Sequence, residues 1–383
     1  MWGWIAMKTY EVELSVLSNV HIGCNEKISK YEYVFNPKHK EVKVIDIRKV
    51  LAYVIENNKK DEYFNFISNI SEKKNNSDWG LANFLEKNFS NSEELIEKNT
   101  VYNLEDCSED YRLDDIDCFI KDKNTNMPYI PGSSLKGVIS NAVYYYLTKF
   151  LIKSFNIYDI YSDENKSNIK TLDKVLKKIM QCFSVSDSEL IGVDKLCVSK
   201  VYYFNVIRNR IKSLNQKYEM LKKGATTKHI LKIDNERLYL NPFDDIREKS
   251  EKELYDTFIK KFTIEFLLKI IKSYNEMYQK FYLSKFLEYK NENPINVEDV
   301  QPNAVRIFVG AKTGFPNKTI YCQVYEEQAG HKIFNVLKEK FARTVKYDNI
   351  RHISPACLKV VKTGAEYYEM GAVQMKIKEL NLV

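Results

Sequence analysis

A turn that leads directly into a long helical pattern is the feature that most constrains the fold of this chain. The turn is Pro131-Gly132-Ser133-Ser134, and either serine is a suitable N-cap residue. Apolar residues then recur at alternating spacings of three and one, which places them on a single helix face. They are Leu135, Val138, Ile139, Ala142, Val143, Tyr146, Leu147, Phe150 and Leu151. The pattern predicts a helix with one buried face.

The start of this helix also suits phosphate binding. A helix N-terminus presents free N–H groups and the positive end of the helix dipole, and both attract phosphate. Lys136 lies in the first turn, where it opposes the dipole, and a bound phosphate would offset that penalty. Gly137 lowers the stability of the helix by ~1 kcal/mol relative to Ala. A glycine at this position is explained if an RNA backbone or another chain packs closely there. A capped structural helix whose lysine faces solvent explains the same residues, so both interpretations stay open.

Alternating apolar and polar residues predict strands elsewhere in the chain. Val12, Leu14 and Val16 alternate with polar residues, as in a half-buried strand. Further strands are predicted at 31–35, 41–47, 182–186, 196–204, 305–309, 358–362 and 372–378, and helices at 48–99, 249–290 and 333–341. This order indicates an α+β fold with two ferredoxin-like (RRM-like) units and helical insertions.

The length of 383 residues suits two or three folded units. We predict an N-terminal ferredoxin-like unit at 1–200, with a helical insertion at about 48–115, and a largely helical middle region at 201–303. Two prolines within 291–303 indicate a linker, and a C-terminal ferredoxin-like unit is predicted at 304–383.

Composition narrows the classes of function. The net charge is +7, with 27 Tyr and 20 Phe, and basic plus aromatic residues suit RNA, although most of these rings are expected in the core. No apolar run reaches the ~18 residues of a membrane-spanning helix. The seven cysteines form no C-x-x-C pair, which favours free thiols in a reducing cytoplasm over disulfides or a zinc site.

Five segments of the chain together resemble the RAMP superfamily of CRISPR proteins. Pro128–Gly137 resembles the hallmark loop of that family, and Leu17–Gly23 resembles its first strand and the loop that follows. Phe183–Ser188 resembles the family's V-S-D-S strand, and Gly310–Thr319 its second glycine-rich loop. Tyr368–Gly371 resembles a terminal P-M-G turn. The matches follow the family's order along the whole chain.

Among RAMP proteins, the layout is similar to the subunit that caps the 3′ end of the type III-A (Csm) effector complex. The resemblance implies an RNA-binding subunit that contacts the crRNA near its 3′ end and supports crRNA maturation in antiviral defence. It also implies crRNA and the other RAMP subunits of the Csm complex as partners, a cytoplasmic location and no cofactor. Two positions depart from the family: Asn19 replaces a proline, and Gly310–Gly314 lacks the usual aromatic residue, so we expect charge from Lys312 there.

The candidate RNA contacts implied by these loops lie far apart in the sequence. They are His21, Gly23, Lys27, Gly132, Ser133, Ser134, Lys136, Lys312, Thr313 and Lys318. If they contact phosphates, Lys136→Ala should weaken crRNA retention about equally for all RNA sequences.

Catalysis has weaker support than binding. His21 is the only histidine in a motif, and one histidine without a second acid or base favours an RNA contact over cleavage. The sister subunits that cut target RNA use an Asp after the first strand, and residues 23–30 contain none. Asp114-Asp115-Ile116-Asp117 could bind Mg²⁺, but a solvated loop is the favoured interpretation. We expect no enzyme and no metal.

Two alternatives stay open. The first is a metal-independent RAMP endoribonuclease that processes repeat RNA with His21 as its base. The second is a structural adaptor that recruits a trimming nuclease and touches RNA little.

Overall fold

The computed structural model describes residues 7–72, 80–110, 112–155, 163–239, 249–288, 294–340 and 353–380. The strands are β1 Lys8–Val16, β2 Gly23–Ile28, β3 Tyr33–Asn36, β4 Glu41–Ile45, β5 Thr100–Asp106, β6 Ile116–Phe119, β7 Phe183–Val185, β8 Leu196–Asn205, β9 Arg210–Leu221, β10 Thr226–Ile233, β11 Ile295–Asn296, β12 Val305–Phe308, β13 Cys357–Thr363, β14 Glu366–Glu369 and β15 Ala372–Leu380.

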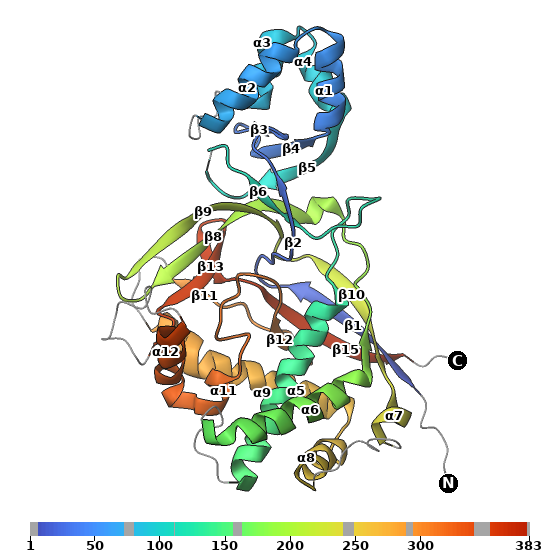
Figure 1. Cartoon of the computed structure of the whole chain (residues 1–383), viewed down its shortest axis with the longest axis vertical. Helices are drawn as coiled ribbons and strands as arrows, with labels where there is room; N and C mark the ends of the chain where they lie inside the picture. Colours follow the sequence, from blue (N-terminus) through green and yellow to red (C-terminus); the bar gives the residue numbers. More distant parts are fainter. Residues whose placement is uncertain are drawn as a thin grey trace.

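The helices are α1 Ile47–Glu56, α2 Lys60–Glu72, α3 Leu81–Asn88, α4 Ser92–Asn99, α5 Gly132–Phe155, α6 Lys166–Gln181, α7 Asn235–Tyr239, α8 Lys249–Ile259, α9 Ile264–Tyr278, α10 Ser284–Leu287, α11 Tyr321–Tyr325 and α12 Ala329–Lys340. A π-helical turn, Gln279–Leu283, joins α9 to α10. The fold is a mixed α+β arrangement with two curled sheets (Figure 1).

Strand β1 is the centre of the first sheet. Its neighbours are β10 on one side and β15 on the other, both antiparallel, and the full order is β12-β15-β1-β10-β7. Val12 and Leu14 are fully buried while Glu11 and Glu13 are half-buried, so the predicted alternation is confirmed. Strand β15, close to the end of the chain, thus completes the sheet that the first strand begins. The division at 1–200, 201–303 and 304–383 stays a prediction.

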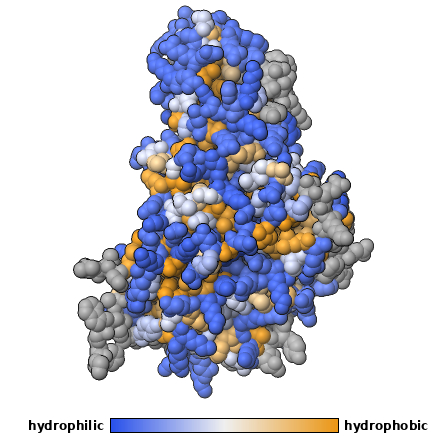
Figure 2. Space-filling view, turned by 180° about the vertical axis from the view of Figure 1, so that it is seen from behind, coloured by the Kyte–Doolittle hydropathy of each residue, from blue (hydrophilic) through white to orange (hydrophobic). Residues whose placement is uncertain are grey.

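The second sheet links the body of the molecule to a head. Its order is β11-β14-β13-β8-β5-β4-β3, and β9 pairs with both β8 and β6. The head consists of β3, β4, α1–α4 and β5, and it projects from the remainder of the chain, the body (Figure 1). The helical pattern predicted at 48–99 is confirmed by α1–α4. On the face in Figure 2, hydrophilic side chains dominate the head and hydrophobic ones gather over the body.

Helix α5 confirms the predicted helix with a buried face, although both serines that were expected as its cap lie inside its first turn. It runs from Gly132 to Phe155, and the residues of its apolar stripe that are fully buried include Leu135, Ile139 and Leu147. It packs against α9, α6 and β7, on the side of the sheets away from the head (Figure 1). No helix among the described residues is long and apolar enough to cross a membrane.

The sequence did not predict strands β9 and β10. Strand β10 does alternate, since Thr227, His229 and Leu231 are buried while Lys228 and Lys232 lie outward. The alternation was obscured because the stretch is rich in lysine and its buried positions include Thr and His. Only pairing with β1 reveals these polar residues as inward-facing.

Candidate nucleic-acid interface

Helix α5 begins at a close backbone contact that only glycine permits. A Cβ atom at Gly132 would lie 2.5 Å from the carbonyl oxygen of Ser186, so any other residue would force α5 and the end of β7 apart. The N–H of Gly132 donates to Oδ1 of Asp187 at 2.8 Å. The carboxylate caps the positive end of the helix. Two motifs that the sequence shows separately therefore form one structural unit.

Two more contacts hold this unit together. The N–H of Ile130 donates to Oγ of Ser188 at 2.9 Å, and the N–H of Ser188 donates to the carbonyl of Ile130 at 3.0 Å. The ammonium group of Lys136 donates to the carbonyl of Phe183 in β7 at 2.7 Å. Lys136 therefore has a partner inside the protein, which leaves fewer of its donors for phosphate.

His21 is buried behind the site, at 3% exposure. Its Nδ1 lies 2.8 Å from the carbonyl oxygen of Glu219, and its ring packs edge-on against Tyr218 with centroids 5.0 Å apart. Burial lowers the pKa of His21 below its usual value of 6.5, so the ring is neutral near pH 7. The carbonyl of His21 accepts the N–H of Ala311 at 2.7 Å. Its backbone thus joins the first loop to the glycine-rich loop.

The glycine-rich loop packs on this backbone. Gly310 has φ +96°, and a Cβ there would collide with the carbonyl oxygen of His21, so both conformation and space require glycine. Lys312 adopts φ +64°, a region that non-glycine residues rarely occupy. Thr313 is buried, and its Oγ1 has no hydrogen-bond partner among the described residues.

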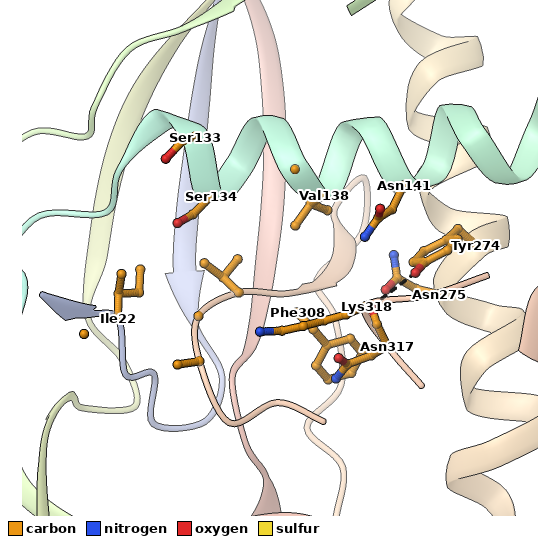
Figure 3. A pocket seen from close by; sticks show the side chains of 15 residues that line it. Ile22, Ser133, Ser134, Val138, Asn141, Tyr274, Asn275, Phe308, Asn317 and Lys318 are labelled. Carbon is orange, nitrogen blue, oxygen red and sulfur yellow. Dashed lines mark hydrogen bonds between the residues drawn. The ribbon is translucent and has the colours of Figure 1, made fainter. Parts of the chain in front are cut away.

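The three loops meet at one cavity of about 510 Å³, which we call the α5 pocket (Figure 3). The first loop contributes Ile22 and Gly23, and α5 contributes its first two turns and Asn141. The glycine-rich loop contributes Gly310, Ala311, Asn317 and Lys318, and α9 contributes Tyr274 and Asn275. Four of the predicted residues therefore line one cavity: Gly23, Ser133, Ser134 and Lys318.

The other predicted residues lie outside the lining of the α5 pocket. His21, Gly132 and Thr313 are buried behind it, and Lys136 is engaged with β7. Lys27 pairs with Asp117 at 3.3 Å. Lys312 lies over the ring of Tyr218, 5.7 Å from its centroid. These placements leave the predicted RNA contacts as predictions.

Lys318 in the lining of the α5 pocket, the nearby Lys312 and Lys359 of β13 form a cluster that has no acidic partner among the described residues. Burial and the positive charge of Lys312 lower the pKa of Lys318, even though its side chain reaches solvent. Burial lowers the pKa of Lys359 in β13, and Lys312 adds to that effect. No carboxylate among the described residues forms an ion pair with Lys312, Lys318 or Lys359. Repulsion within this lysine cluster favours an anion.

Lys359 was not predicted from the sequence. It pairs across the sheet with Tyr203 of β8, and its ammonium group lies 5.6 Å from the centroid of that ring. A half-buried tyrosine beside a lysine offers a stacking face next to a positive charge, as in single-strand binding surfaces. The contact between Lys359 and Tyr203 was missed because the pairing of their two strands was not predicted, although each strand was.

The predicted acidic cluster has partners of its own. Oδ1 of Asp115 accepts the N–H of Lys30 at 3.1 Å, and Asp117 pairs with Lys27. Among the described residues, no group of three His, Cys, Asp or Glu residues could hold a metal ion. The seven cysteines are free thiols.

Comparison with known proteins adds a family. The RAMP superfamily matches residues 13–303. The curated relatives include proteins named "CRISPR system Cms protein Csm5". That of Streptococcus thermophilus is 24% identical and covers 98% of both chains. That of Enterococcus italicus is 21% identical, over 87% of this chain and 86% of its own, and that of Methanocaldococcus jannaschii is 26% identical, over 87% and 78%.

Solved structures share the fold. One chain of a Csm–crRNA–target RNA ternary complex of a type III-A CRISPR-Cas system superimposes with a TM-score of 0.70 at 19% identity, covering 96% of this chain and 100% of its own. The crystal structure of T. onnurineus Csm5 gives 0.59 at 20% identity, covering 94% and 99%. The chain therefore resembles Csm5 along nearly its whole length.

Proposed function

The chain belongs to the RAMP superfamily, and we propose that it is an RNA-binding subunit of a type III-A CRISPR (Csm) ribonucleoprotein. Its RNA would be the crRNA near the 3′ end, and its role would be to support crRNA maturation in antiviral defence. The other RAMP subunits of the complex would be its neighbours. The proposal is supported by the solved Csm–crRNA–target RNA ternary complex, because one of its chains has the same fold as this protein.

One observation carries the RNA-binding proposal. The α5 pocket collects loops from three distant parts of the chain, and its Lys318 belongs to a lysine cluster that has no carboxylate partner in the described part of the chain. A phosphodiester backbone is the anion that would pass several lysines in succession. Tyr203 supplies a stacking face at the far end of the cluster.

The direct test is binding of the full-length chain to single-stranded RNA across a salt series. We expect affinity to fall linearly on a log–log plot as salt rises, because phosphate contacts release counterions. A chain that binds no RNA even at low salt would contradict the proposal.

We propose that the subunit does not cleave RNA. The burial of His21 and its contact with the Glu219 carbonyl leave its ring poorly placed to take a proton from a ribose hydroxyl. Incubation with repeat RNA in EDTA should leave the RNA intact. Specific cleavage that disappears in His21→Ala would favour the endoribonuclease alternative.

The finer description of the fold is also a proposal. Strands β1, β7, β10 and β15, with α5 after β1 and α9 after β10, follow the β-α-β-β-α-β order of a ferredoxin-like unit. Their order in the sheet, β15-β1-β10-β7, places the first and third strands in the centre. A second such unit would include strands of the other sheet.

A further inference from the structure

The α5 pocket has an inner end whose chemistry differs from that of its cationic entrance. Asn141 of α5, Asn275 of α9 and Asn317 of the glycine-rich loop line this end. Figure 3 shows Asn141 pointing from α5 toward Tyr274 and Asn275. Three amides from three separate elements thus line this end, whereas the side chain of Lys318 extends toward the start of α5. Amides pair with neutral hydrogen-bonding groups, not with phosphate alone.

Asn317 is held rigidly with an unused acceptor. The residue is 6% exposed, and its Nδ2 donates to the carbonyl of Thr313 at 2.8 Å. Its backbone carbonyl accepts the hydroxyl of Tyr274 at 3.1 Å, the bond drawn dashed in Figure 3. Oδ1 of Asn317 has no hydrogen-bond partner among the described residues. A buried acceptor without a partner is costly, and a donor on a ligand would offset that cost.

Asn141 is likewise available. Its side-chain amide makes no hydrogen bond with any described residue, and it lines the same cavity. An asparagine amide offers donors and an acceptor next to each other, which matches the edge of a nucleobase. Apolar walls formed by Ile22, Val138 and Phe308 complete the lining.

The dimensions also fit. Ser134 and Asn141 are seven residues apart on α5, so the cavity runs along roughly 10 Å of that helix. A cavity of 510 Å³ is within the usual range of small-ligand sites. The hydroxyls of Ser133 and Ser134, with Lys318, lie toward the start of the helix, and the amides lie toward its middle (Figure 3).

We propose that the α5 pocket holds one nucleotide of the bound RNA, turned out of its stack. Its phosphate lies beside Ser133, Ser134 and Lys318, and its base edge contacts the amides of Asn141 and Asn317. This inference rests on the proposed RNA-binding function and adds to it a base-dependent contact at a single position. Sequence-specific RNA recognition commonly uses bases splayed out of the strand in this way.

The test uses the full-length chain and a set of RNA oligomers, each with one abasic site at a successive position. We expect one position at which loss of the base weakens binding about tenfold, the size of a single good recognition contact. In Asn141→Leu, which replaces the amide with an apolar group of the same branched shape, the loss at that position should largely disappear. Asn141→Ser serves as a second variant should the leucine disturb the fold, and Asn65→Leu, an exposed asparagine of α2, is the matched control.

The outcomes separate the two proposals. A flat abasic scan with tight binding of the intact RNA would overturn the nucleotide pocket and leave the RNA-binding function standing. A position-dependent loss that is unchanged in both Asn141 variants would also overturn it. No binding of any oligomer would instead contradict the proposed function itself.

Discussion

Removing the lysine cluster tests the electrostatic argument most sharply. The variant carries Lys312→Ala, Lys318→Ala and Lys359→Ala together. None of the three has an acidic partner among the described residues, so no carboxylate is left unpaired by the change. Loss of mutual repulsion should leave the fold intact or slightly more stable.

The size of the effect follows from counterion release. Each phosphate contact on single-stranded RNA contributes about 0.7 to the slope of log K against log salt. Three lost contacts reduce the slope by about 2, and at about 0.1 M salt they lower affinity roughly 100-fold.

The assay is fluorescence anisotropy of labelled single-stranded RNA with the full-length chain over several KCl concentrations. The control is Lys252→Ala, Lys260→Ala and Lys261→Ala, which removes the same charge from exposed positions in and just after α8. Helix α8 lies at the end of the body far from the head (Figure 1). Equal slopes of log K against log salt for the two triple variants would refute phosphate binding at the lysine cluster, because net charge alone would then explain the affinity.

Three further predictions concern single positions. Gly132→Ala should destabilise the fold by about 1–3 kcal/mol, because the added methyl group would collide with the backbone at the end of β7. Gly137→Ala has no atom near the added methyl group, so it should be neutral or stabilise the fold by up to about 1 kcal/mol, and thermal unfolding distinguishes the two variants. Burial raises the pKa of Glu369 to about 8, so the free energy of unfolding should fall as the pH rises from 4.5 to 8. The stability of Glu369→Gln relative to the wild type should therefore increase by more than about 1.4 kcal/mol between pH 5 and pH 9, and an equal difference at both pH values contradicts this. Lys136→Ala should lower RNA affinity less than Lys318→Ala, because the Lys136 ammonium already bonds to Phe183; the opposite order would restore Lys136 as a main phosphate contact.

Local patterns in the sequence predicted elements whose signal lies within a few residues. The alternation of Val12, Leu14 and Val16 and the stripe of α5 are of this kind, because burial on one face of a strand or helix sets the residue pattern directly. The loops of the site were found through resemblance to a family. Gly23, Ser133, Ser134 and Lys318 do line one cavity.

Contacts between remote strands could not be predicted in the same way. Capping of Gly132 by Asp187 and the pairing of Lys359 with Tyr203 depend on which strands are neighbours. No local pattern encodes that choice, since many pairings satisfy the same alternation. The same limit applies to Lys136. Its position in the first turn suggested a phosphate contact, and its hydrogen bond to β7 could not be predicted without knowing that β7 lies beside α5.

Photocrosslinking of the assembled ribonucleoprotein, with mapping of the crosslinked peptides of this chain, tests the central claim most directly. We predict crosslinks in the residues that line the α5 pocket and at Tyr203 and Lys359. Crosslinks confined to the head, or none in this chain while its neighbours crosslink, would contradict an RNA path over the α5 pocket.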